Sequence, residues 1–113
     1  MSVSDPKTID AMTVSGGQLV MLISDHLRWD GYQAEHLSML QDKLNTYIRY
    51  IDSGGYKEKY SGADISSFVI DVVFLHPFDI GFVRMVELVR PEFDKRNITI
   101  KYRISNSRKE SAK

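Results

Sequence analysis

The sequence contains no cysteine, and this absence excludes several kinds of chemistry at once. Without thiols there is no disulfide framework, no cysteine nucleophile and no zinc site built on sulfur ligands. A net charge is also missing, because 15 lysines and arginines balance 15 aspartates and glutamates. A chain without an overall positive field has little attraction for phosphate backbones, so nucleic acid is not an expected partner.

Long apolar runs are missing as well. The longest, residues 19–23 and 68–75, are far shorter than the ~20 residues that a membrane-spanning helix needs. The first eight residues are polar and include Asp5 and Lys7, which is not the pattern of a secretory signal. We therefore expect a cytoplasmic protein that does not contact a membrane.

Catalytic and cofactor motifs are absent too. The chain has no G-x-S-x-G, no P-loop and no G-x-G-x-x-G after a strand. Its three histidines, His26, His36 and His76, follow no spacing typical of a metal site. We expect no cofactor, no metal ion and no catalytic residue, and we favour a protein without enzymatic activity.

The residues that are present favour one α+β domain over residues 1–104. The chain has 113 residues, of which 42% are hydrophobic and 27% charged, a balance typical of globular proteins. Two short β-prone runs, residues 9–14 and 18–24, flank a Ser-Gly-Gly turn and predict a hairpin. The polar tail, residues 105–113, lacks any apolar pattern, so we expect it to be disordered.

Two helices are predicted. Asp30 stands three residues before Gln33, a capping-box spacing that predicts a helix start, and Ser53 with two glycines ends this helix. Its apolar stripe contains Leu37, Leu40, Leu44, Tyr47, Ile48 and Ile51, and its solvent side contains Gln41, Asp42, Lys43, Asn45 and Arg49. The second helix follows Pro77 and Asp79, and Pro91 either kinks it or ends it near Arg90.

The remaining strands are residues 68–75 and 99–104, and a long connection, residues 55–67, is either functional or mobile. The element order is thus β-β-α-β-α-β. Crossovers between parallel strands are right-handed, so we expect a four-stranded mixed sheet in the order 1-2-3-4 with both helices on one face. The last strand suits an edge because Lys101 and Arg103 point outward from it.

The opposite face of such a sheet would carry an apolar stripe. Its expected members are Val20, Leu22, Val69, Val73 and Leu75. One interpretation is that the N-terminal segment, the long connection or a helix covers this stripe. The other is that a protein partner or a second copy of the chain binds it as a homodimer, with Tyr56 and Tyr60 of the connection as further contact residues.

A second candidate site lies where the strands 18–24 and 68–75 end. Ligands of parallel α/β arrangements gather beyond the carboxyl ends of the strands. The polar residues expected at this rim are Asp25, His26, Arg28, Trp29, His76 and Asp79. They suit in type a small-molecule, anion or metal site, whereas the simpler interpretation is that Asp30 and Asp79 serve helix N-termini and Trp29 is an apolar anchor.

Three segments of the chain resemble a family of small uncharacterised bacterial proteins. They are S-V-S-D-P-K-T-I-D (residues 2–10), D-H-L-R-W-D (residues 25–30) and H-L-S-M-L-Q-D-K-L-N-T-Y-I (residues 36–48), the last followed by I-D-S-G-G. Pro91 and the basic tail depart from the family pattern. The resemblance implies a bacterial setting and a fold, but no catalytic residue. We therefore expect a non-enzymatic protein-interaction module or homodimer, with ligand binding at the rim as the alternative.

Overall fold

The computed structural model describes residue 5 and residues 7–105. The predicted tail therefore lies almost wholly outside the described residues. The elements follow the predicted order, with a short extra helix, α2, directly after α1. They are β1 (Ala11–Ser15), β2 (Gln18–Asp25), α1 (Gln33–Ser53), α2 (Gly55–Lys59), β3 (Ser67–Phe74), α3 (Ile80–Lys95) and β4 (Ile98–Ile104).

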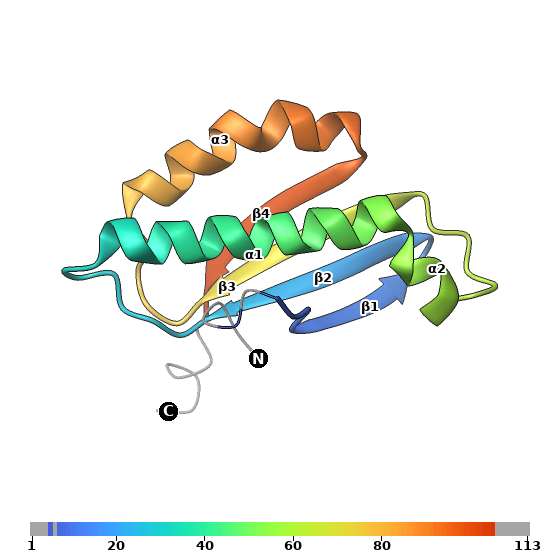
Figure 1. Cartoon of the computed structure of the whole chain (residues 1–113), viewed down its shortest axis with the longest axis horizontal. Helices are drawn as coiled ribbons and strands as arrows, with labels where there is room; N and C mark the ends of the chain where they lie inside the picture. The colour runs from blue at the N-terminus through green and yellow to red at the C-terminus, as the bar shows by residue number, and fades with distance from the viewer. Residues whose placement is uncertain (1–4, 6, 106–113) are drawn as a thin grey trace.

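The predicted architecture is confirmed. The sheet has the order β1-β2-β3-β4, with β1 antiparallel to β2 and the other pairs parallel. Helices α1 and α3 lie on the same face of this sheet (Figure 1). The carboxyl ends of the three parallel strands and the N-termini of both long helices consequently gather at one end of the molecule (Figure 1).

The hairpin depends on two glycines. Gly16 and Gly17 connect β1 to β2 with φ angles of 57° and 79°, both in the left-handed region. Two successive residues with positive φ are typical of a type I′ turn, whose twist matches that of the two strands. The turn pairs Ser15 with Gln18 and sets the register of the hairpin.

The core lies between the sheet and the two long helices. Side chains alternate along each strand, so residues 19, 21 and 23 of β2 face the helices together with residues 68, 70, 72 and 74 of β3. The buried helix residues opposite them are Leu40, Leu44, Tyr47 and Ile51 of α1 and Phe82, Val86 and Phe93 of α3. The ring of Phe82 packs edge-on against the rings of Phe74 and Tyr102, with centroid distances of 4.9 and 5.1 Å.

Two helix predictions need correction or completion. Asp30 does not cap α1, because Gly31 turns the chain with a φ of 85° and Tyr32 occupies the cap position without a side-chain hydrogen bond. Helix α3 continues through Pro91 to Lys95. Pro91 lies on the exposed side of the helix, where the backbone oxygen that it leaves without a donor can be hydrated. None of the helices in the described part of the chain has the length and hydropathy needed to cross a bilayer.

Candidate functional site

The rim at the carboxyl ends of the strands is the first candidate site. The backbone N–H of Leu75 donates to the carbonyl of Asp25 at 2.8 Å, so the ends of β2 and β3 are neighbours, as expected. Asp25 and Trp29 are buried, whereas His26 and Arg28 are exposed and His76 and Asp79 are half-buried. The six rim residues therefore share one end of the fold but not one surface.

A buried contact between Asp25 and His36 accounts for the burial of Asp25. Asp25 Oδ2 lies 2.5 Å from Nε2 of His36, and Asp25 Oδ1 accepts from the N–H of Leu27. Nδ1 of His36 lies 3.2 Å from the carbonyl oxygen of Arg28. Both ring nitrogens thus contact oxygen atoms of the protein, and the His36 side chain is buried. Neither nitrogen is therefore accessible to a metal ion or to a substrate.

Trp29 covers one face of the His36 ring. Its indole stacks on the His36 ring with centroids 3.8 Å apart and planes 14° from parallel. The ring of Phe74 lies 6.1 Å away on the core side. Trp29 therefore anchors the β2–α1 connection, as the simpler interpretation has it.

Asp79 is the N-cap of α3 and accepts from the backbone N–H of Gly81 at 2.8 Å. This bond satisfies one of the free N–H groups of the first turn. Among the described residues, no group of three or more histidine or acidic side chains is arranged to hold a metal ion. His26, Arg28 and His76 are the rim residues whose side chains are left without such a structural contact in the described part of the chain.

A shallow apolar cleft borders the rim. It is lined by Leu27, Arg28, Tyr32, Glu35, His36 and Met39. Its lining is mostly hydrocarbon, and Tyr32 at its mouth is 69% exposed. Under the alternative hypothesis of a small ligand at the rim, the ligand would lie in this cleft.

A second buried polar network joins α1 to the segment before β1. Lys43 is fully buried, so its predicted place on the solvent side of α1 is wrong. Its Nζ lies 2.7 Å from Asp10 Oδ1 and donates to the carbonyl oxygens of Asp5 and Thr8 at 2.6 and 2.7 Å. The long side chain thus reaches several acceptor oxygens of the segment before β1, which has no regular secondary structure. Lys43 therefore attaches the N-terminal segment to the core.

Tyr47, one turn further along α1, extends this network to the sheet. Its hydroxyl donates to the carbonyl oxygen of Leu22 and accepts from the N–H of Asp10. Asp10 Oδ2 in turn accepts from the N–H of Ser24, continuing the ladder of the β1–β2 pair beyond Ala11. Burial, aided by the negative charge of Asp10, raises the pKa of Tyr47 well above its usual range.

Replacing Tyr47 by phenylalanine is expected to lower the free energy of unfolding by about 1–3 kcal/mol at neutral pH. The carbonyl of Leu22 and the N–H of Asp10 would then lose a partner inside the protein. Urea denaturation of both proteins measures the difference. A loss much below this range would mean that water replaces the hydroxyl.

The same pair of proteins tests the pKa of Tyr47. Because the pKa is raised in the folded state, the unfolded chain loses this proton first, above about pH 10. The stability contributed by Tyr47 is fully present below that pH and falls by about 1.4 kcal/mol per pH unit above it. The wild type should therefore lose its stability advantage over Tyr47→Phe as the pH rises, and a constant difference would contradict the assignment.

The second candidate surface is the sheet face opposite α1 and α3, which we call the open face. None of the helices in the described residues lies on it (Figure 1). Val20, Leu22 and Val73 are half-buried on it, Leu75 is exposed, and Val69 is buried between Val20 and Thr99. Asp71 stands among these apolar side chains with its Oδ2 3.6 Å from Nη2 of Arg103. Its Oδ1 is buried and has no hydrogen-bond partner within the described residues.

Tyr56 and Tyr60 do not belong to the open face. Tyr56, in α2, packs edge-on against Phe68 with centroids 5.2 Å apart, and Phe68 faces the helices. The hydroxyl of Tyr60 donates to the carbonyl of Met12 at 3.3 Å. The two tyrosines are half-buried where α2 and the residues after it pack on the helix side, so they and the open face belong to separate surfaces.

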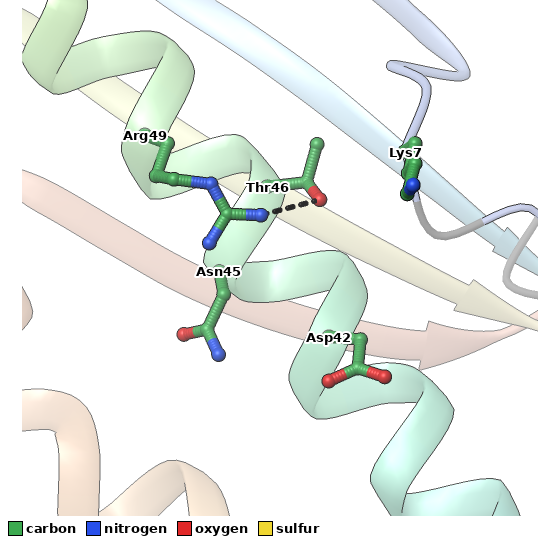
Figure 2. Close-up of a pocket in the computed structure, with 5 residues that line it drawn as sticks. All are labelled: Lys7, Asp42, Asn45, Thr46 and Arg49. Atoms are coloured by element: carbon green, nitrogen blue, oxygen red, sulfur yellow. Dashed lines mark hydrogen bonds between the residues drawn. The ribbon is translucent and has the colours of Figure 1, made fainter.

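A third surface was not anticipated from the sequence. Two adjoining hollows lie between the N-terminal segment and α1, and both are lined by Lys7, Thr46 and Arg49. Figure 2 shows the first of them, with Lys7 on the N-terminal segment and the other four labelled residues on α1. The polar side of α1 was visible in the sequence. The position of Lys7 was not, because no local pattern places residues 5–10 against this helix.

No match to the chain was found among curated proteins or among solved structures. Residues 1–106 match the model of DUF6572, a family of unknown function. Because the match covers nearly the whole chain, the protein belongs to the DUF6572 family.

Proposed function

We propose that this protein is a non-enzymatic interaction module that forms a homodimer through its open face. The observation that supports the proposal most is the composition of that face. An apolar stripe of β2 and β3 side chains lies on this face, and no helix in the described part of the chain covers it. Stripes of this kind on small proteins commonly mark interaction sites.

The charges on the open face favour a second copy as the occupant. A two-fold interface brings the same surface of two molecules together, so that surface must complement itself. The open face carries an acid, Asp71, on β3 and two bases, Lys101 and Arg103, beside it on β4. A two-fold interface that includes both strands therefore offers the acid of each copy to the bases of the other.

The unpartnered oxygen of Asp71 supports the same arrangement. A buried carboxylate oxygen without a donor costs free energy, and a lysine or arginine from a second copy would provide that donor. The formal net charge of zero adds no long-range repulsion between copies. The proposed interface thus combines apolar burial with reciprocal ion pairs.

The test compares two substitutions of the same kind at different places. Val73→Glu replaces an apolar member of the stripe by a carboxylate two residues from Asp71 and should convert the dimer into a monomer, because the interface would lose apolar burial and gain like charges. Leu88→Glu is the control, since Leu88 is 82% exposed on α3, away from the sheet. Sedimentation equilibrium of the wild type and both variants measures the mass.

The expected result is a dimer for the wild type and Leu88→Glu and a folded monomer for Val73→Glu, with circular dichroism showing that each variant is folded. A wild type that stays monomeric at all concentrations would refute the homodimer. A dimer that survives Val73→Glu would place the interface elsewhere on the molecule.

A further inference from the structure

The surface between the N-terminal segment and α1, which we call the α1 groove, carries a further inference that is independent of the open face. Its lining residues are Lys7, Ile9, Asp42, Asn45, Thr46, Arg49, Tyr50 and Ser53. Each α1 member has another member three or four residues away, so they share one side of the helix. Over residues 42–53 this side extends about 16 Å, which is long enough for a small ligand with polar groups at both ends.

Two cations in the groove have no acidic partner among the described residues. Neither Lys7 nor Arg49 forms an ion pair with any residue that the structure describes, and the one hydrogen bond of the Arg49 side chain is to the Thr46 hydroxyl at 3.4 Å (Figure 2). By contrast, Lys43, Arg96 and Arg103 each contact an aspartate. Asp42 lines the same groove but pairs with neither cation.

Lys7 lies beside α1 because the backbone on either side of it is attached to this helix. Lys43 binds the carbonyl oxygens of Asp5 and Thr8, which lie on either side of Lys7 along the chain. The backbone that carries Lys7 is therefore attached to α1 by a fully buried side chain. A site whose backbone is already in place loses less conformational entropy when a ligand binds.

We propose that the α1 groove binds a small ligand with one oxyanion, a phosphate or a carboxylate, and a hydrogen-bond donor at its other end. The guanidinium of Arg49 and the ammonium of Lys7 bind the oxyanion, since arginine matches the geometry of carboxylates and phosphates. The hydroxyl of Thr46 and the amide of Asn45 lie on the same stretch of α1 as neutral polar partners. Asp42 at the end of the groove accepts from the donor and repels a second anionic group.

An NMR titration of the full chain tests this site with three probes. Inorganic phosphate and succinate distinguish a phosphate from a carboxylate, and phosphoethanolamine adds an ammonium group for Asp42. We expect at least one probe to shift the amide signals of residues 7 and 45–49 at millimolar concentration, with phosphoethanolamine binding more tightly than inorganic phosphate if the oxyanion is phosphate. Binding of succinate without either phosphate probe would assign the oxyanion as a carboxylate.

Three variants decide whether the binding is specific. Arg49→Gln should weaken binding about tenfold or more, because it removes a charged hydrogen-bond donor. Arg84→Gln removes an equivalent exposed arginine from α3 and should leave the affinity unchanged. Asp42→Asn should abolish the preference for phosphoethanolamine over phosphate. The proposal is overturned if no probe shifts these signals, or if Arg49→Gln binds as tightly as Arg84→Gln.

Discussion

Replacing Lys43 by methionine is expected to lower the free energy of unfolding by about 3–5 kcal/mol, a large part of the stability of a small domain. Methionine retains much of the buried hydrocarbon but none of the donors. The carboxylate of Asp10 would stay buried without its cation, and the carbonyls of Asp5 and Thr8 would lose their donor. Urea denaturation monitored by the fluorescence of Trp29 measures the loss.

A second background separates the ion pair from packing. In an Asp10→Asn protein the carboxylate charge is already gone, so the same Lys43→Met change should cost about 1–3 kcal/mol less. Equal costs in both backgrounds would show that packing and the backbone carbonyls, not the ion pair, account for the role of Lys43. A total loss below about 1 kcal/mol would contradict the buried network itself.

Replacing His36 by phenylalanine should be the other severe change, again with a cost of about 3–5 kcal/mol. Phenylalanine preserves an aromatic ring for Trp29 to stack on, but Oδ2 of Asp25 and the carbonyl of Arg28 lose their partners. The contact lies at the β2–α1 connection, so the change acts on the rim as well as on global stability. Thermal and urea unfolding measure the global effect.

To separate the contact with Asp25 from packing, the cost of His36→Phe is also measured in an Asp25→Asn protein. The asparagine keeps the acceptor for the Leu27 N–H and removes the carboxylate that contacts His36. His36→Phe should therefore be milder in this background, by about 1–3 kcal/mol. If His36→Phe costs the same in both proteins, the 2.5 Å contact does not represent an ion pair of energetic importance.

The two networks have a consequence for function. Asp25 and Trp29 of the predicted rim serve the β2–α1 connection, and Asp79 caps a helix. Binding a ligand through Asp25 would require breaking a buried contact. We therefore propose binding at the open face and at the α1 groove. Among the described residues, an acceptor on the open face lacks a hydrogen-bond partner and two cations in the groove lack an acidic partner.

Much of the fold was predictable because its signals are local. The alternation of residues 19–23 and 68–74, the two glycines after Ser15 and the apolar stripe of α1 each act within a few residues of chain. Right-handed crossovers then left one simple sheet order, and the structure has this order. The start of α1 was predicted wrongly because the left-handed turn at Gly31 competes with capping by Asp30.

The sequence by itself thus determined the strands, the two long helices, the sheet order and the existence of an apolar open face, because periodicity and handedness are properties of neighbouring residues. Only the tertiary structure decided that Lys43 is buried and that Lys7 and Arg49 line the same groove. Lys43 meets Asp5 and Thr8 from 38 and 35 residues away. Such contacts depend on how an irregular segment packs on a distant helix, and no local pattern encodes that packing.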